Sequence, residues 1–245
     1  MTDFAFKGFD GPRDLHAVFT FRPGTADENT ILATYHEDEY HFVDFGPQDG
    51  DWMIDAGGYI GSTAILYAQL YPKAHVLTIE PLPENVLLLR KNIEANGLSA
   101  RITVLDRALW STSVGSTKVF YRDASTVGSV HRFIGSAFPN YHETVSKDGA
   151  EALNISLDHC IELYGMNRVR LLKMDVEGAE YPILEGVSPQ MLGKIQTMTG
   201  EYHNTDPQNE KQPRTKLYTN IEPLFDDCSK EPEKPTWGAF LFQRK

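Results

Sequence analysis

An α/β fold with a doubly wound, mostly parallel sheet is predicted by the order of the elements along the chain. From Trp52 onward, short apolar strands alternate with helices, beginning with strands at 52–55, 75–80 and 101–105. Strands this short and apolar are typical of a sheet that helices cover on both faces. A repeated strand–helix–strand order favours right-handed crossovers between parallel strands.

The helices that join these strands have recognisable faces and ends. Residues 61–71 follow a helical period that stops before Pro72. Residues 83–96 place an apolar stripe on one face, and Gly97 is a natural C-terminal stop. Further helices are expected at 156–164, 179–186 and 216–225, and further strands at 117–121, 169–174, 195–202 and 237–243.

The first fifty residues are predicted to form a β-rich cap on the main domain rather than an independent domain. Aromatic and β-branched residues favour strands at 18–21 and 40–45. The segment from Thr25 to Glu28 has the spacing of a capping box, which marks the start of a helix. The main domain is then 51–245. Within it, residues 111–150 have no clear period and predict an irregular lid.

The composition indicates a globular, cytoplasmic protein that acts on small molecules. The net charge of −11, from 34 acidic and 23 basic residues, disfavours nucleic acid as a partner. We expect no membrane association, because no apolar run approaches the ~18 residues that span a bilayer. The first nine residues also lack the apolar core of a signal peptide. Cys160 and Cys228 fit no metal-binding spacing, so we interpret them as reduced thiols.

A glycine-rich turn follows the first strand of the main domain and predicts a ligand site. It reads Asp55-Ala56-Gly57-Gly58-Tyr59-Ile60-Gly61, and such turns lie at the carboxyl edge of the sheet, where open α/β folds bind ligands. Gly57 allows a tight turn, and Gly61 allows the helix to pack close to the strand. Tyr59 stands where the dinucleotide fingerprint places its second glycine, which weakens a nicotinamide interpretation.

Two acidic residues follow the next two strands. Glu80 ends the second strand, where a carboxylate can accept hydrogen bonds from both hydroxyls of a ribose. Asp106 comes directly after the third strand, where it is placed to accept from an adenine amino group. The set as a whole predicts a nucleoside site at this edge of the sheet.

Four segments resemble the signatures of the FkbM family of S-adenosylmethionine-dependent O-methyltransferases. They are Ile54-Asp55-Ala56-Gly57, Glu80-Pro81, the run from Leu172 to Glu180 with its Lys-x-Asp-x-Glu-Gly-x-Glu pattern, and Gly200-Glu201-Tyr202-His203. The resemblance covers about residues 52–205. It implies a class I methyltransferase fold with a seven-stranded sheet, S-adenosylmethionine as cofactor and an oxygen acceptor. The expected cofactor-binding residues are Asp55, Gly57, Gly58, Tyr59, Gly61, Glu80, Pro81, Asp106, Ala108 and Asp175.

Methyl transfer needs alignment of the reactants and a deprotonated nucleophile. If the fourth and fifth strands are neighbours, Asp175 and His203 meet beside the cofactor. His203 is the expected base, because imidazole titrates near neutral pH, and Glu201 is expected to orient it. Asp175 is expected to hold the cofactor's ammonium or orient the acceptor. No metal is expected, although Asp175 and Glu177 would suit Mg²⁺; Glu180 is interpreted as a favourable acid at a helix N-terminus.

The segment 118–147 is basic in an acidic protein, and its bias suggests an anionic substrate. Arg122, His131 and Arg132 are expected to bind it. We therefore expect a carboxylate acceptor and a methyl ester product in specialised metabolism, with a hydroxyl acceptor as the alternative. More remote alternatives are a nucleotide-dependent oxidoreductase and a non-catalytic S-adenosylmethionine-binding protein. A homodimer is expected only by analogy with related methyltransferases.

Overall fold

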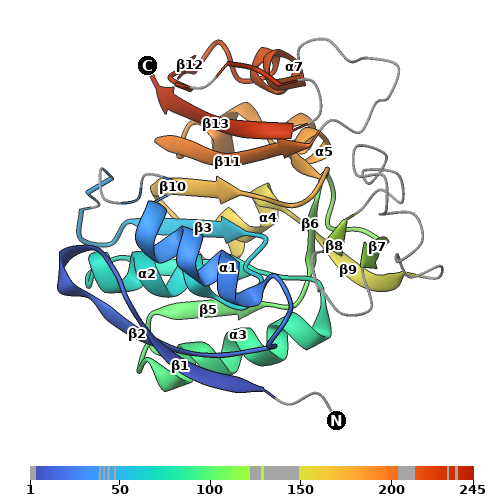
Figure 1. Cartoon of the computed structure of the whole chain (residues 1–245). Coiled ribbons are helices and arrows are strands. Elements are labelled where there is room, and N and C mark those ends of the chain that lie inside the picture. The colour runs from blue at the N-terminus through green and yellow to red at the C-terminus, as the bar shows by residue number, and fades with distance from the viewer. Residues whose placement is uncertain are drawn as a thin grey trace.

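The protein is described by a computed structural model at residues 4–38, 40, 42, 45–46, 48–121, 128–129, 149–203, 213–230, 232–234 and 237–245. Within these residues the main sheet contains β3 (Trp52–Ala56), β4 (His75–Ile79), β5 (Ile102–Leu105), β10 (Val169–Met174), β11 (Thr197–His203), β12 (Phe225–Asp227) and β13 (Trp237–Arg244). Their order across the sheet is β12-β13-β11-β10-β3-β4-β5 (Figure 1). The five strands from β5 to β11 run parallel, and β13 runs antiparallel to both of its neighbours. The predicted doubly wound, mostly parallel sheet is confirmed.

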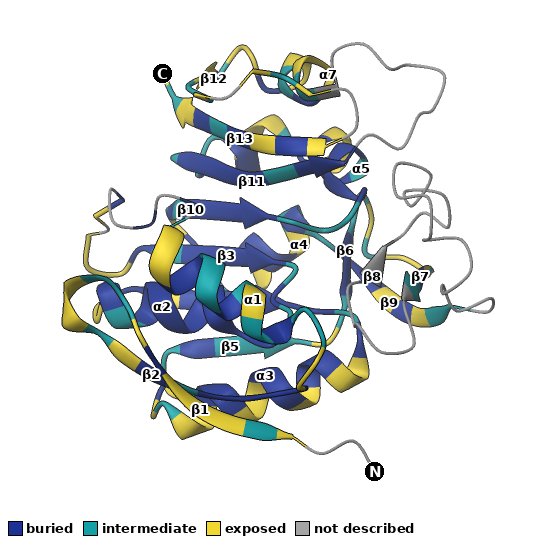
Figure 2. Ribbon diagram, in the orientation of Figure 1, coloured by how far each residue is buried: buried dark blue, intermediate teal, exposed yellow. Residues whose placement is uncertain are grey.

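Helices cover both faces of this sheet. They are α2 (Ser62–Leu70), α3 (Pro83–Ala95), α4 (Leu157–Leu163), α5 (Glu180–Gly186), α6 (Pro189–Leu192) and α7 (Pro213–Thr219). Successive strand residues point to opposite faces, so Met53 packs with α2 and α3 whereas Ile54 packs with α4 and α5. The central strands are therefore buried along their length (Figure 2). Each large apolar side chain buried in this way contributes about 1.5–3 kcal/mol.

The N-terminal segment begins with a hairpin, β1 (Ala5–Asp10) and β2 (His16–Phe21), joined through a short 3₁₀ turn, η1 (Pro12–Asp14). The sequence predicted β2 but not β1. Two amide side chains, Asn92 in α3 and Asn96 directly after it, hold β2 against the main domain. Asn92 accepts from the Thr20 backbone N–H at 2.7 Å and donates to its carbonyl oxygen at 3.1 Å, and Asn96 bonds to Val18 in the same way.

A helix, α1 (Asp27–Leu32) with its continuation η2 (Ala33–Glu37), follows the hairpin. It begins near the predicted position, but no capping box forms: the Thr25 hydroxyl donates to the Arg22 carbonyl oxygen. The strand predicted at 40–45 is wrong for its described residues. Tyr40 and Phe42 are buried, yet neither belongs to a strand, and the Phe42 N–H donates to the Asp38 carboxylate. Their aromatic content reflects burial rather than strand pairing.

A small second sheet lies beside the main one. It contains β6 (Ala108–Trp110), β7 (Ser116–Tyr121), β8 (Gly128–Ser129) and β9 (Ala150–Ser156) in the order β6-β9-β7-β8. The sequence predicted β7 but assigned the other described residues of 111–150 to an irregular segment. The chain's last predicted helix, 216–225, is also displaced: α7 ends at Thr219, and the chain turns into β12. Among the described residues, no helix has the length and apolar character needed to cross a membrane.

Candidate active site

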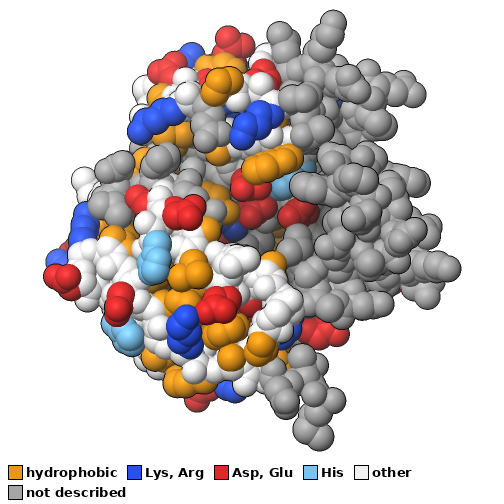
Figure 3. Space-filling model, in the orientation of Figure 1, with side chains coloured by type: hydrophobic (Ala, Val, Ile, Leu, Met, Phe, Trp, Pro, Cys, Tyr) orange, Lys and Arg blue, Asp and Glu red, His pale blue; other side chains and the backbone are white. Residues whose placement is uncertain are grey.

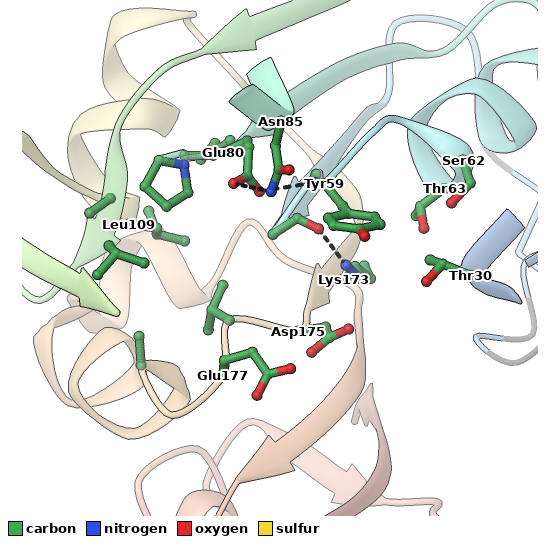
Figure 4. Close-up of a pocket in the computed structure, with 18 of the residues that line it drawn as sticks. Thr30, Tyr59, Ser62, Thr63, Glu80, Asn85, Leu109, Lys173, Asp175 and Glu177 are labelled. Carbon is green, nitrogen blue, oxygen red and sulfur yellow. Dashed lines mark hydrogen bonds between the residues drawn. The ribbon is translucent and has the colours of Figure 1, made fainter. Parts of the chain in front are cut away.

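The sheet has a switch point between β3 and β10. The chain builds outward from β3 to β4 and β5 on one side, and from β10 to β11 on the other. Open α/β sheets bind ligands beyond the carboxyl ends of their strands at such a point. A cavity of about 200 Å³ opens there (Figure 4). It is lined by Thr30, Tyr40, Gly57, Gly58, Tyr59, Ser62, Thr63, Ile79, Glu80, Pro81, Asn85, Ala108, Leu109, Val119, Lys173, Asp175, Val176, Glu177 and Ala179.

The glycine turn after β3 forms one wall of the cavity. Gly57 has a φ of +81°, and a Cβ placed on it would lie 1.9 Å from the Asp175 carbonyl oxygen. A Cβ on Gly58 would lie 2.0 Å from the Thr78 hydroxyl oxygen. The turn is therefore pressed against its neighbouring strands, and no side chain fits at these two positions. This close approach leaves backbone groups, rather than side chains, facing the cavity.

Glu80 lies at one end of the cavity with its carboxylate held in place. Its Oε2 accepts from the Tyr59 backbone N–H at 3.0 Å, and its Oε1 accepts from Leu82 N–H and from the Asn85 amide, both at 3.1 Å. Burial raises the pKa of Glu80 to about 7, although these three hydrogen bonds act to lower it. Each carboxylate oxygen has two lone-pair sites, so Oε2 can accept a further bond. The carboxylate is fixed and still able to bind a donor.

The N-terminal segment reaches this wall through a buried ion pair that the sequence did not reveal. Arg22 donates to both oxygens of Asp27 at 2.8 Å and also to the Asn85 side chain at 3.0 Å. Asp27 accepts from the Tyr59 hydroxyl, and the Arg22 guanidinium lies over the Tyr59 ring. Asn85 in turn bonds to Glu80. One continuous network thus joins the N-terminal segment to the glycine turn and to Glu80.

Asp55 lies beneath the turn, fully buried, rather than on the cavity surface. Its Oδ2 accepts from the Thr78 hydroxyl at 3.0 Å, and its Oδ1 lies 3.4 Å from Lys173 Nζ. Burial raises the pKa of Asp55, while the Lys173 charge and the Thr78 hydroxyl act to lower it. Lys173 also donates to the Gly57 carbonyl oxygen at 2.8 Å. The pair therefore supports the turn from below.

The opposite end of the cavity is acidic. Asp175 and Glu177 follow β10 and lie side by side (Figure 4). His203, at the end of β11, has its Nε2 3.6 Å from Glu177 Oε2 and 3.5 Å from Glu201 Oε2. Its Nδ1 lies 3.0 Å from Glu180 Oε1. Acidic side chains gather beside a histidine in the middle of the face that Figure 3 shows.

The surroundings of His203 favour its charged form. Burial acts to lower the pKa of His203, but the carboxylates of Glu177 and Glu180 outweigh it and hold this pKa well above its ordinary value. His203 lies at the end of β11, where the sequence predicted it, and its role as base stays a prediction.

Glu180 makes more contacts than expected for an acid that only stabilises a helix N-terminus. It is fully buried and accepts from the backbone N–H groups of Val176 and Gly178 as well as facing His203. It therefore fixes both the loop that carries Glu177 and the imidazole ring. Glu201, the residue expected to orient His203, faces the other ring nitrogen.

The structure brings together most of the sequence-predicted residues. Those that line the cavity are Gly57, Gly58, Tyr59, Glu80, Pro81, Ala108 and Asp175. Asp55 and Gly61 lie behind the turn, and Asp106 is exposed and paired with Arg107. Glu201 and His203 adjoin the cavity next to Glu177. The predicted substrate-binding residues Arg122, His131 and Arg132 lie outside the described residues.

Comparison with known proteins identifies a family whose sequence model matches most of this chain. The sequence model of the methyltransferase FkbM domain matches residues 55–231. Methyltransferase sdnD of Sordaria araneosa is 29% identical over an alignment of 160 positions, which covers 57% of this chain and 61% of that protein. The 31-O-demethyl-FK506 methyltransferase FkbM of Streptomyces tacrolimicus is 28% identical, over 68% of this chain and 70% of that protein. The chain thus spans less than two thirds of the length of the Sordaria relative.

The solved structures that match this chain include another methyltransferase. The precorrin-6y C5,15-methyltransferase of Geobacter metallireducens superimposes with a TM-score of 0.45 at 12% sequence identity. The superposition covers 87% of this chain and 90% of that chain.

Proposed function

The chain belongs to the methyltransferase FkbM family, and we propose that it methylates a hydroxyl group of a small molecule. Its cofactor is S-adenosylmethionine, and its fold is that of class I methyltransferases. The observation that carries the proposal is the distribution of acidic side chains in the cavity. Glu80 lies at one end, and Asp175 and Glu177 make the other end acidic. The identity of the acceptor and the roles of single residues are proposals, argued below from the described contacts.

The cavity fits the cofactor in each of its parts. Glu80 is a fixed, buried carboxylate with spare acceptor capacity, as a ribose diol requires. The apolar side chains of Ile79, Leu109 and Val119 offer a surface for the adenine ring. Asp175 and Glu177 give this end of the cavity a negative field, which favours the cationic sulfonium end of the cofactor. When bound, S-adenosylmethionine supplies the electrophilic methyl group.

The chain's own residues would align the reactants. Lys173 and Asp55 hold the glycine turn at a fixed distance from β10, because Lys173 bonds to Gly57 from below. The Arg22–Asp27 pair holds Tyr59 and Asn85, and Asn85 holds Glu80. Fixed positions of this kind contribute to catalysis because the geometry is set before the substrate arrives.

Glu80→Gln should remove a pH dependence of cofactor affinity. A ribose diol donates hydrogen bonds and so prefers the ionised carboxylate, while the free protein holds Glu80 protonated below its pKa of about 7. The affinity for S-adenosylhomocysteine should therefore rise with pH up to about pH 7 and then level, with a limiting slope of about tenfold per pH unit. Calorimetric titration at several pH values measures this slope.

The control for this slope is Glu84→Gln, which neutralises an exposed carboxylate on α3, the helix that follows Glu80. It should keep the full pH dependence, because Glu84 does not line the cavity. If the affinity for S-adenosylhomocysteine had the same pH dependence in the wild type and in Glu80→Gln, Glu80 would not be the residue that binds the ribose.

The described site favours a hydroxyl acceptor over the carboxylate that the sequence analysis expected. A carboxylate placed near Asp175, Glu177 and Glu201 would be repelled, whereas a hydroxyl donates a hydrogen bond to any of them and can pass its proton to that carboxylate as the methyl group is transferred. The one described basic residue of the segment 118–147, Lys118, is exposed, while its neighbour Val119 faces the cavity. The printed name of the Streptomyces relative, a 31-O-demethyl-FK506 methyltransferase, also supports oxygen as acceptor.

The product of methyl transfer tests this choice. A panel of hydroxylated and acidic metabolites is incubated with methyl-labelled S-adenosylmethionine, and the labelled products are treated with mild alkali. An ether keeps its label, whereas a methyl ester loses it. We expect the product to keep its label. Release of the label as methanol would show that the acceptor is a carboxylate.

The remaining expectations are carried forward as part of this proposal. We place the reaction in specialised metabolism, in the cytoplasm, with residues 1–50 as a cap on the catalytic domain and with a homodimer as the assembly. The net charge of −11 supports a small molecule rather than nucleic acid as the acceptor.

A further inference from the structure

We propose that Asp175, Glu177 and His203 bind a divalent metal ion at the acidic end of the cavity. One potential ligand atom from each of the three residues lies within 4.8 Å of the others. Donor atoms that each lie about 2.0–2.2 Å from a common ion are separated by less than this, so small side-chain movements suffice to close the site. Asp175 and Glu177 line the cavity, and His203 adjoins it.

The buried imidazole is the second observation that points to an ion. His203 is 7% exposed, and its Nδ1 is fixed by Glu180 at 3.0 Å. Its Nε2 points toward Glu177 and Glu201 but stays 3.5–3.6 Å from their oxygens, longer than an ordinary N–H···O hydrogen bond. A metal-binding histidine commonly has this arrangement, with one nitrogen on a carboxylate and the other directed at the ion.

Neighbouring residues also hold the other two proposed ligands, Asp175 and Glu177, in position. The Tyr40 hydroxyl donates to Asp175 Oδ2 at 3.1 Å and so helps to fix this carboxylate, which lines the cavity. Glu177 has a φ of +52°, and Glu180 holds the loop around it through the N–H groups of Val176 and Gly178. The loop is thus bound in a conformation that brings the Glu177 carboxylate beside Asp175.

The local charge favours a cation. Among the described residues, Asp175, Glu177, Glu180 and Glu201 surround one imidazole. The lysine that lines the cavity, Lys173, is paired with Asp55. Carboxylates this close to one another repel unless a positive charge lies between them, and a divalent ion would supply that charge in place of the His203 proton.

The donor set indicates which metal would bind. An imidazole with two carboxylates is a mixed nitrogen and oxygen set, which suits a transition ion such as Mn²⁺. Three protein ligands leave coordination positions open on the ion. Given the proposed function, one of these positions would take the acceptor oxygen, and the ion would favour loss of its proton.

Mn²⁺ binding tests the proposal without any methyl transfer. Metal-free protein, prepared with a chelator, is titrated with MnCl₂ and free Mn²⁺ is followed by electron paramagnetic resonance. We expect one saturable Mn²⁺ per chain, with affinity reduced at least about tenfold in Glu177→Gln. Asp49→Asn removes an exposed carboxylate that pairs with Lys73 and should leave the affinity unchanged.

Three results would overturn the site. They are the absence of saturable binding in the wild type, equal affinity in Glu177→Gln and the wild type, and displacement of Mn²⁺ by S-adenosylhomocysteine. The last result would assign the carboxylates to the cofactor's ammonium group instead. His203→Gln gives a second ligand variant if Glu177→Gln does not fold. Because the titration needs no acceptor, the metal site and the methyltransferase proposal can fail separately.

Discussion

Gly57→Ala should unfold the glycine turn and abolish cofactor binding. The φ of +81° costs a residue with a side chain about 1–2 kcal/mol, and the new methyl group would lie 1.9 Å from the Asp175 carbonyl oxygen. Relief of that overlap requires β3 and the loop after β10 to separate, which also moves Asp175 away from the cavity. We expect a total loss of more than about 3 kcal/mol in the free energy of unfolding, as for other overpacked sites with backbone strain.

Gly97→Ala is the matched control for Gly57→Ala. Gly97 has a φ of +68°, but nothing lies within 4 Å of the position of its Cβ. Gly97→Ala therefore introduces backbone strain without a steric overlap, and it should lower the free energy of unfolding by about 1–2 kcal/mol. Denaturant unfolding of both variants, with calorimetric titration of S-adenosylhomocysteine, separates the two effects. Equal losses in the two variants, with cofactor binding kept in Gly57→Ala, would contradict the close approach of the turn to Asp175.

Lys173→Met should destabilise the protein by about 3–5 kcal/mol, because it leaves the Asp55 carboxylate buried without its cation. Among the described residues Asp55 Oδ1 has no hydrogen-bond partner, so no other described group would replace the charge of Lys173. The adjacent turn would also lose the bond from Lys173 to Gly57. Denaturant unfolding at neutral pH measures the change.

The exposed pair Lys73–Asp49 provides the comparison for Lys173–Asp55. Both of its side chains are largely exposed, so Lys73→Met should change the free energy of unfolding by less than about 1 kcal/mol. The double variant Lys173→Met/Asp55→Asn should recover part of the loss, since it removes the unpaired charge as well. A loss in Lys173→Met no larger than in Lys73→Met would show that the buried pair does not stabilise the turn.

Local patterns were sufficient to predict the central sheet. The strands β3, β4 and β10 consist of short apolar runs, and helices with one apolar face separate them, so their type follows from the sequence alone. The small second sheet was harder to predict from the sequence. In β9, buried and exposed residues alternate only in part, and the three-residue β6 becomes a strand only because β9 pairs with it.

The site was predictable where its residues follow strands in sequence. Gly57, Glu80 and Asp175 each come directly after a parallel strand, and parallel strands bring their carboxyl ends to one edge of the sheet. The contacts that depend on distant packing were not predictable. No local signal joins Arg22 to Asn85 or identifies Lys173 as the partner of Asp55.

His203 shows the same limit in electrostatic terms. Its position at the end of β11 follows from the order of the strands and was predicted from the sequence. Its charge state depends on carboxylates from a different part of the chain, Glu177 and Glu180, whose distance from the ring is set only by the fold.

A crystal structure of the protein with S-adenosylhomocysteine tests the central claim most directly. The account predicts the nucleoside in the cavity beside the Gly57–Gly58 turn, with both ribose hydroxyls within hydrogen-bond distance of Glu80. It also predicts that the sulfur end of the molecule faces Asp175 and Glu177. A nucleoside bound elsewhere, or one whose ribose does not contact Glu80, would contradict the account.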